Sequence, residues 1–549
     1  MKPVHKFLLL AIIALAAYLR LYRLSEIPPG VNRDEASIGY TAYSLLQTGK
    51  DEYGRSFPLS FESFGDWKLP LYIYTTIPFV GLLGMTELAV RLPSALAGIF
   101  SIGALYVLVR ILFGNIPLAL LSSLILTLSP WHIHISRVES ESNVAIFLST
   151  LATIFFLKAI SRKRTLWLTL SGLFFAATYY TYHGSHIFTT LLAAGLLMLH
   201  HKEVFRIPRW PIAAGVSFFF VAFILVFTLF SANKTKISGI GIFGNPTVVH
   251  ERIELPRLIH EDPSSLFSRI LHNKPVYALI TMSQNFLKSY SPEFLFIKGG
   301  DNHAHNIKGY ANMHLFESIF LILGITLLLT GIKKRQYSLI VWWIVVAGVA
   351  PAITKDAPHS NRMFAIVPAL AITVALGMQH VLLMNKKITI FSSIVIGLFY
   401  IGSLFLYADA YFIHFPKEEA RHWGDGYKKL VTFLSIPGYK DKQIIMTSPE
   451  ASPYIYLLFY GKYNPADYHR EAMRYPITAD GFTNVAGFNR FSFREINWNS
   501  DISNSQNLLV ASSNEIPKYI RDDTFYKTTD IFLPDGKAQF TVIEGRRKI

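Results

Sequence analysis

The sequence predicts a polytopic α-helical membrane protein whose last membrane span is followed by a small α/β domain. Hydrophobic residues make up 51% of the 549 residues, and long apolar runs recur as far as residue 410. Charged residues make up 16% of the chain, well below the ~25% that is typical of soluble domains. After residue 412 the apolar runs shorten and alternate between helical and strand-like patterns, which predicts an α/β domain.

Eleven apolar segments have about the length that a bilayer requires, which is roughly 20 residues. The predicted spans are 7–24, 88–112, 116–130, 144–160, 166–182, 187–201, 211–230, 313–332, 338–354, 363–383 and 388–410. The apolar stretch 69–84 is predicted to be an interfacial or re-entrant helix, because counting it as a span would invert every later loop. We expect the first span to be retained, since its apolar run from Phe7 to Leu19 is followed by Arg20 and Arg23 in place of a small-residue cleavage site.

The short basic clusters predict the orientation. They lie at Lys2/Lys6, 162–164, 202–209, 333–335 and Lys386-Lys387, and the positive-inside rule places such clusters in the cytoplasm. The N-terminus is then cytoplasmic, and the active site and the C-terminal domain are extracytoplasmic, in a multi-pass protein of the cell membrane. The predicted domains are a membrane module (1–412), with outer loops 25–87 and 231–312, and an extracytoplasmic α/β domain (413–549).

The charge and the cysteine count exclude several classes of function. The net charge of +16 is distributed in clusters between apolar runs, which favours membrane topology and an anionic substrate over nucleic acid. The chain has no cysteine, so disulfides, a thiol nucleophile and thiolate metal sites are excluded.

An acidic pair, Asp34-Glu35, comes directly after the first predicted span. A carboxylate in the bilayer core would cost roughly 3 kcal/mol, so the pair is expected to face water or a substrate. The other candidate residues also lie in the predicted outer loops or at the outer ends of spans: Asp66, Lys68, Arg137, Glu139, Glu141, His183, His186 and Arg362. Carboxylates can take a proton from a hydroxyl, and Arg or Lys can bind a phosphate leaving group.

Simpler explanations exist for each of these residues. Acids beside a span are commonly solvated, arginines at span ends commonly extend to the interface, and Asp66 could pair locally with Lys68. Four histidines could form a divalent-cation site with Glu141 or Asp301, although polar loop histidines are the favoured interpretation; they are His132, His134, His303 and His305. The identity of a metal is therefore left open, and no cofactor is required.

Several sequence blocks resemble those of membrane glycosyltransferases of the GT-C class. The blocks are Arg33-Asp34-Glu35-Ala-Ser-Ile-Gly39-Tyr40, Gly65-Asp66-Trp67-Lys68-Leu-Pro70-Leu-Tyr72, Glu87-Leu-Ala-Val-Arg91-Leu-Pro93-Ser94, Ser129-Pro130-Trp131-His132 with Ser136-Arg137 and Glu141-Ser-Asn143, Ser291-Pro292-Glu293-Phe294-Leu295-Phe296, and Asn361-Arg362 with Pro368. The resemblance is to the superfamily of protein O-mannosyltransferases and aminoarabinose transferases. Within it, the prokaryotic dolichyl-phosphate-mannose–protein mannosyltransferase-like branch is the most similar.

This resemblance implies a GT-C fold and an inverting transfer of a sugar from a polyprenyl-phosphate donor at the outer membrane face. Asp34 matches the family's first acid and is the candidate base, with Glu35 beside it, and Glu141 matches the second-loop acid. The implied substrate-binding residues are Asp66, Lys68, Arg137, His183 and Arg362. His186 stands where many relatives have an arginine. The acceptor could be a protein hydroxyl, a lipid or a surface glycan.

Two other functions are compatible with a multi-pass protein. A transporter or flippase of lipid-linked sugars usually has repeated halves and ionisable groups near the middle of the membrane, whereas this chain places its ionisable groups outside the apolar runs. An O-antigen ligase or polymerase would concentrate its polar residues in one late loop, and the acidic pair in the first loop argues against it.

Overall fold

The computed structural model describes residues 2–230, 241–244, 246–384, 386–447, 451–478, 482–521 and 526–544. The first residues of the predicted 231–312 loop and the last residues of the predicted 413–549 domain lie outside these ranges. Contacts divide the chain into two compact units. We call residues 1–22 and 94–408 the helical unit, and residues 23–93 and 409–549 the sheet unit. The first predicted outer loop thus groups with the C-terminal residues.

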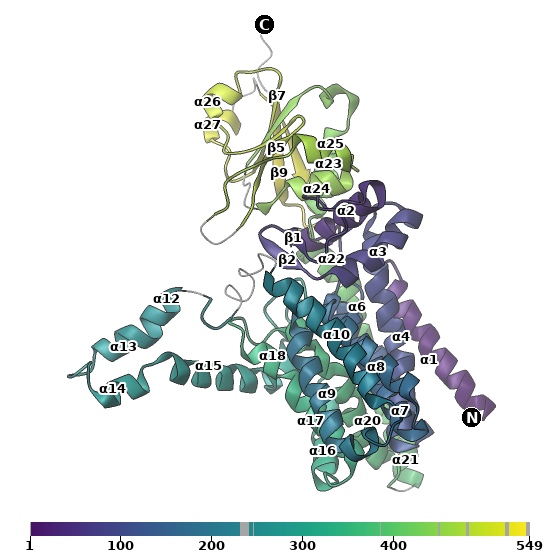
Figure 1. The fold of residues 1–549 in the computed structure, drawn as a ribbon. Coiled ribbons are helices and arrows are strands. Elements are labelled where there is room, and N and C mark those ends of the chain that lie inside the picture. The colour runs from purple at the N-terminus through teal and green to yellow at the C-terminus, as the bar shows by residue number, and fades with distance from the viewer. Residues whose placement is uncertain are drawn as a thin grey trace. The chain divides into compact units, whose positions relative to one another are not determined.

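The helical unit is a bundle of helices (Figure 1). Its main helices are α1 (Pro3–Leu21), α4 (Glu87–Phe113, from Ser94 onward), α5 (Ile116–Leu128), α6 (Pro130–Ser136), α7 (Glu141–Arg162), α8 (Thr165–Tyr179), α9 (His183–Val204), α10 (Trp210–Phe230), α16 (Glu317–Thr330), α17 (Arg335–Ala347), α18 (Val349–Ala352), α19 (Ser360–Met363), α20 (Val367–Leu382) and α21 (Lys386–Asp409). Every predicted span falls on one of these helices. Among the described residues, six helices are long and apolar enough to cross a membrane, or seven if the bent pair α5–α6 is one span. The count of eleven spans therefore stays a prediction.

Helices at the edge of the bundle expose apolar side chains, and helices inside it do not. The apolar window of α21 is 6% buried and that of α10 is 11% buried, whereas the window that covers α19 and α20 is 72% buried. Apolar helices with exposed surfaces are stable in lipid and not in water. The helical unit is therefore a membrane bundle.

Glycines allow two helices of the bundle to touch. A Cβ on Gly324 of α16 would lie 2.0 Å from the Thr373 carbonyl oxygen of α20, and a Cβ on Gly377 would lie 2.1 Å from the Phe320 carbonyl oxygen. In lipid there is little hydrophobic force between helices, so close backbone packing at small residues contributes much of their association.

The sheet unit contains a seven-stranded mixed sheet in the order β4-β5-β6-β3-β7-β9-β8. Its strands are β3 (Gln443–Met446), β4 (Met473–Arg474), β5 (Val485–Phe488), β6 (Phe491–Phe493), β7 (Asn507–Ser512), β8 (Lys527–Phe532) and β9 (Ala538–Glu544). β3 runs parallel to β6 and β7, and the other pairs are antiparallel. The helices of this part are α22 (Phe415–Glu418), α23 (Asp425–Leu434), α24 (Tyr454–Tyr460), α25 (Pro465–Glu471), α26 (Trp498–Asp501) and α27 (Lys518–Arg521).

The first-loop residues of the sheet unit form helix α2 (Arg33–Thr48), a hairpin of β1 (Phe61–Ser63) and β2 (Asp66–Lys68), and helix α3 (Pro70–Leu83). α3 has 14 residues, fewer than a straight span requires, and its interfacial placement stays a prediction. α2 packs against α3, α24 and α25. The packing on α24 is close, because a Cβ on Gly39 would lie 2.5 Å from the Phe459 ring.

The long loop of the helical unit is structured where it is described. It contains α12 (Pro246–Val249), α13 (Leu255–Leu258), α14 (Leu266–Leu271) and α15 (Lys274–Ser289). Figure 1 shows these helices as an arm that leaves the bundle. We refer to residues 246–289 as the arm.

The glycine packing generates a first prediction. Gly377→Leu should abolish most of the folded, monodisperse protein, because its side chain meets the backbone of α16 and cannot be accommodated by a rotamer change. Gly397→Leu in α21 is the matched control, since no atom lies within 4 Å of its added Cβ. The yield and elution profile of detergent-solubilised protein measure both variants. Equal behaviour of the two would contradict the close packing of α16 and α20.

Candidate functional site

Asp34 and Glu35 lie in the first turn of α2. Asn32 caps this helix: its side chain accepts a hydrogen bond from the Glu35 amide at 2.9 Å, and the Glu35 carboxylate accepts one from the Asn32 amide at 3.4 Å. This is a capping box. The helix dipole favours negative charge at this end, so both acids lie where a negative charge stabilises the helix.

The two acids have different surroundings. The Asp34 side chain is 58% exposed and accepts a hydrogen bond from Lys68 Nζ at 2.7 Å. Glu35 is fully buried and forms a two-point ion pair with the equally buried Arg91, at 3.0 Å (Nε–Oε1) and 2.9 Å (Nη2–Oε2). Asp34 is therefore accessible to a substrate, whereas Glu35 is held inside the sheet unit.

Arg91 extends this buried network into the chain that precedes α2. It donates hydrogen bonds to the carbonyl oxygens of Leu24 at 3.0 Å and Pro28 at 2.9 Å, and also to that of Gly30. The Glu35–Arg91 pair thus fixes the approach to α2, which makes Glu35 a positioning residue for Asp34. Arg91 occurs in one of the sequence blocks, but sequence reasoning did not predict it as a site residue.

The β1–β2 hairpin holds Lys68 and Asp66. Phe61 pairs with Lys68 and Ser63 with Asp66, and Ser63 Oγ lies 2.8 Å from Ser37 Oγ of α2. These contacts fix the hairpin against α2 and bring Lys68, which is almost buried, onto Asp34. The Asp66 carboxylate accepts a hydrogen bond from the Trp67 amide at 2.8 Å. The sheet unit therefore brings Lys68 onto Asp34, with Glu35 in the same turn of α2, and Asp66 lies two residues before Lys68 on the hairpin.

Glu52 is a second buried acid that the sequence did not predict as important. Its carboxylate accepts a hydrogen bond from the Tyr454 hydroxyl of α24 at 2.7 Å, and burial raises its pKa to about 7. At the other end of α2, the Tyr460 hydroxyl accepts a hydrogen bond from the Val31 amide at 2.9 Å. α24 therefore contacts the residues before α2, the residues after α2 and the middle of α2 itself.

In the helical unit, a bend between α5 and α6 positions the second group of predicted residues. The two helices meet at 62°, with Pro130 starting α6 and the Ser129 hydroxyl accepting a hydrogen bond from the His132 amide. The bend leaves the carbonyl groups at the end of α5 without helical partners. Arg20, which is fully buried, donates to the carbonyl oxygens of Leu126 at 3.3 Å and Thr127 at 3.4 Å.

Arg137 and Glu141 follow this bend. Arg137 is fully buried and donates to the Leu19 carbonyl oxygen at 2.9 Å, so it does not extend to the interface. Glu141 is the first residue of α7, whose N-cap Ser140 accepts a hydrogen bond from the Asn143 amide. Asn143 in turn donates to the Ser94 carbonyl oxygen at 2.7 Å, which fixes the start of α7 on α4.

Arg362 lines a small polar pocket between α7, α9 and α19. The pocket has a volume of about 20 Å³, room for about one water molecule, and its polar lining is Ser142, Ser149, Tyr182, Gly184, Ser185, Asn361 and Arg362. Arg362 Nη2 pairs with Asp356 at 3.1 Å. Its Nη1 is buried and has no hydrogen-bond partner among the described residues. A donor of this kind favours an anion in the pocket.

Tyr182 is the N-cap of α9, and His183 is the first residue of that helix. The Tyr182 side chain lines the same pocket as Arg362. His183 packs its ring against His186 at 5.6 Å. His183 is not among the residues that line the pocket, and its role in substrate binding stays a prediction.

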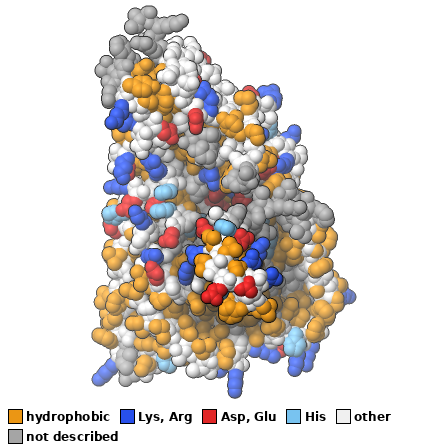
Figure 2. All heavy atoms as spheres, turned by 90° about the vertical axis from the view of Figure 1, so that its left-hand side faces the viewer, with side chains coloured by type: hydrophobic (Ala, Val, Ile, Leu, Met, Phe, Trp, Pro, Cys, Tyr) orange, Lys and Arg blue, Asp and Glu red, His pale blue; other side chains and the backbone are white. Residues whose placement is uncertain are grey.

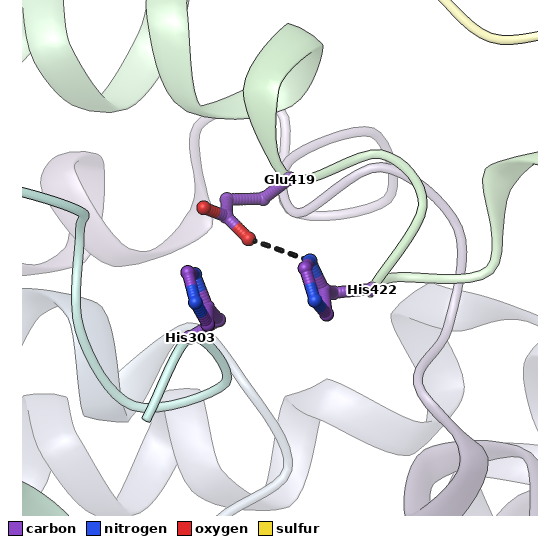
Figure 3. A group of neighbouring side chains, drawn as sticks. All are labelled: His303, Glu419 and His422. Carbon is purple, nitrogen blue, oxygen red and sulfur yellow. Dashed lines mark ion pairs between the residues drawn. The ribbon is translucent and has the colours of Figure 1, made fainter. Parts of the chain in front are cut away.

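Of the four histidines considered as a possible metal site, His132 and His134 are buried on α6, not in a loop, and contact other groups. His132 Nδ1 lies 2.6 Å from the Arg20 guanidinium, and His134 Nε2 lies 3.3 Å from the Ala304 carbonyl oxygen. In the sheet unit, Glu419 and His422 form an ion pair at 3.0 Å (Figure 3), which supplies two ligands where protein zinc sites use at least three. The described residues of each unit, taken separately, contain no group of three metal-ligating side chains.

Part of this chain is similar in sequence to known proteins. Residues 68–228 match the model of the dolichyl-phosphate-mannose-protein mannosyltransferase family. Two Bacillus subtilis (strain 168) proteins named as mannosyltransferases, YycA and YkcB, are each 28% identical to this chain over 163 and 162 residues. The match covers 29% of this chain and 22% of each relative.

Solved structures with the same fold cover nearly the whole chain. ArnT from Cupriavidus metallidurans, bound to undecaprenyl phosphate, has a TM-score of 0.54 and 12% identity, covering 99% of this chain and 98% of ArnT. The Archaeoglobus fulgidus oligosaccharyltransferase with zinc and sulfate has a TM-score of 0.54 and 12% identity, covering 97% and 72%. AglB from the same organism, with dolichol phosphate and an inhibitory peptide, has a TM-score of 0.51 and 11% identity, covering 100% and 75%. The resemblance to GT-C membrane glycosyltransferases is confirmed.

The contrast between the two adjacent acids generates a second prediction. Glu35→Gln should lower the free energy of unfolding by about 3 kcal/mol, because it leaves the buried Arg91 charge without its counter-ion. Asp34→Asn, one residue away, should change it by about 1 kcal/mol or less, because the Asp34 side chain is largely exposed. Thermal and denaturant unfolding in detergent measure both. Equal losses in the two variants would contradict the division of roles.

A third prediction concerns pH. The pKa of Glu52 is about 7 in the folded protein and 4.5 ordinarily, so its contribution to stability is fully present below pH 4.5 and is lost as pH rises through 7. The difference between these two pKa values corresponds to roughly 3 kcal/mol in the free energy of unfolding. The melting temperature of the sheet unit should therefore fall between pH 5 and pH 8, and Glu52→Gln should remove this part of the fall. A profile unchanged by the substitution would refute the assignment.

Proposed function

We propose that this GT-C membrane glycosyltransferase moves a sugar from a polyprenyl-phosphate donor to an acceptor at the extracytoplasmic membrane face, with inversion. The observation that carries the proposal is the accessible Asp34 carboxylate, held by Lys68 and by the cap of α2 beside a buried Glu35. A positioned carboxylate is suited to take a proton from an acceptor hydroxyl.

In this mechanism the acceptor oxygen loses its proton to Asp34 and attacks the anomeric carbon of the sugar. The bond from that carbon to the lipid phosphate breaks on the opposite face, which inverts the configuration. The lipid phosphate leaves with the bonding electron pair and gains negative charge. Lys68 orients the base through its hydrogen bond, and Glu35 acts through Arg91 to hold α2 in position.

Arg362 is the candidate for binding the donor phosphate. Its buried Nη1 lies in a polar pocket that Tyr182 also lines, and a guanidinium donor suits phosphate oxygens. The Ser142 hydroxyl, which also lines the pocket, donates to Asn361 Oδ1. The pocket has room for about one water molecule, so it would bind an oxygen of the phosphate and not the sugar. The ArnT and AglB structures contain undecaprenyl phosphate and dolichol phosphate, respectively, which supports a lipid-phosphate donor. Arg137, Asp66, His183 and Glu141 remain proposed substrate-binding or catalytic residues.

The fourth prediction tests the base. Purified protein in nanodiscs, supplied with radiolabelled polyprenyl-phosphate sugars, should transfer or slowly hydrolyse the sugar. Asp34→Asn should reduce the rate about 10²–10⁴-fold while donor binding persists, and the exposed Asp535→Asn serves as the matched control. Arg362→Gln should instead weaken donor binding, with the exposed Arg335→Gln as its control.

Two outcomes would overturn the proposal. Asp34→Asn protein with wild-type rates would remove Asp34 as the base. Movement of intact donor across the bilayer of proteoliposomes, without cleavage of the sugar, would establish the transporter alternative.

A further inference from the structure

We propose that the arm, residues 246–289, is a membrane-contact element that lies in the lipid–water interface with its apolar face in the acyl region. The proposal concerns a surface that the glycosyltransferase chemistry does not use. It does not depend on the proposed function.

The first support is the orientation of α15, which is the reverse of that of a helix in water. Asn285 is buried and donates to the carbonyl oxygens of Ala352 at 3.1 Å and Thr354 at 2.8 Å, so the polar side of α15 is fixed on the bundle. The apolar side points outward: Leu279 is 68% and Leu287 is 70% exposed. A water-exposed helix buries its apolar face and solvates its polar one. The outer side of α15 therefore fits lipid.

The second support is the exposed apolar surface of α13 and α14. Ile259, just after α13, is 83% exposed, and Leu266 and Phe267 of α14 are 75% and 66% exposed. Ile270 follows Leu266 by one turn and is also exposed, so these residues share one face of α14. Figure 2, which faces the arm, shows apolar side chains there with acidic and basic ones at the margin. Apolar surface of this kind with a polar rim marks a contact with a partner or a membrane.

The arm has hydrogen bonds and helix caps of its own. Its exposed apolar face therefore belongs to folded helices. His260 Nε2 and His272 Nε2 lie 2.8 Å apart and join the ends of α13 and α14. Ser265 caps α14, and Asn273 caps α15 by accepting a hydrogen bond from the Val276 amide at 2.8 Å. The arm thus presents a defined amphipathic surface.

The charges of the arm fit the polar layer of a bilayer. A hollow of the arm, with a volume of about 660 Å³, is lined by Arg257, Arg269 and Lys274 together with Glu254. Basic side chains beside an apolar face are typical of helices that lie in the plane of the interface, where they reach phosphate head groups. The arm belongs to the unit that contains the membrane bundle, so a bilayer is the partner already present next to it.

The test uses the absence of cysteine from the natural chain. Single cysteines at Ile259 and Leu279 carry a bimane fluorophore, and the full-length protein is placed in phosphatidylcholine nanodiscs with acyl-chain-brominated lipid. Bromine should quench both labels at least three-fold more than a label at Lys537→Cys, an exposed position in the sheet unit. A label at Glu261→Cys, on the charged margin of the arm, should show intermediate quenching.

A second variant separates membrane contact from a change of fold. Phe267→Asp should at least halve the quenching at Ile259. The melting temperature should stay unchanged, because Phe267 is exposed and replacing it removes no core packing. Labels at Ile259 and Leu279 that behave like the Lys537 label would overturn the proposal. Efficient cross-linking between Ile259→Cys residues of two chains, without quenching, would also overturn it and assign the surface to a second copy.

Discussion

Burial of the Glu35–Arg91 ion pair is the constraint on which the first-loop segment depends. Neither charge could remain inside the sheet unit alone, since removing one partner of such a pair costs several kcal/mol. Arg91 uses its remaining donors on three carbonyl groups of residues 24–30, so the pair also fixes the chain before α2. Asp34 is adjacent in sequence and on the exposed side of the same turn. Two neighbouring acids therefore take different roles because one faces a guanidinium and the other faces solvent.

The helical unit is constrained by lipid, where every backbone polar group needs a hydrogen-bond partner inside the protein. The bend between α5 and α6 exposes carbonyl groups, and Arg20 of α1 hydrogen-bonds to two of them. Gly98 of α4 allows this region to pack closely, because a Cβ there would lie 2.3 Å from Ser136 Oγ. The bend is thereby stable, and it leads the chain into Arg137 and the start of α7. A basic residue at the end of an apolar span can thus be an internal cap.

The sequence predicted the parts of this fold that depend on local patterns. Every span predicted from an apolar run lies on helix, and the strand-like patterns predicted after residue 412 correspond to strands such as β3 and β7. The blocks single out Asp34 and Lys68 separately, and Asp66 is the partner that the sequence suggests for Lys68, whereas the structure pairs Lys68 with Asp34 at 2.7 Å. The pattern could not reveal the burial of Glu35, the cap formed by Arg20 or the raised pKa of Glu52, because each depends on residues from distant segments. An acid in a loop looks solvated until the partner that buries it is known.

Contacts of α24 with the first-loop segment explain why the C-terminal residues and the first loop form one unit. α24 contacts the chain at three places along α2: Tyr460 at Val31, Phe459 at Gly39 and Tyr454 at Glu52. A helix of 16 residues has little stability of its own in water. Packing of α24 against α2 and its flanking residues supplies the stability that α2 lacks alone. The same packing fixes the position of Asp34 within the sheet unit. A general base is effective only within hydrogen-bond reach of its proton, so the rigidity of this packing is part of the chemistry that we assign to Asp34.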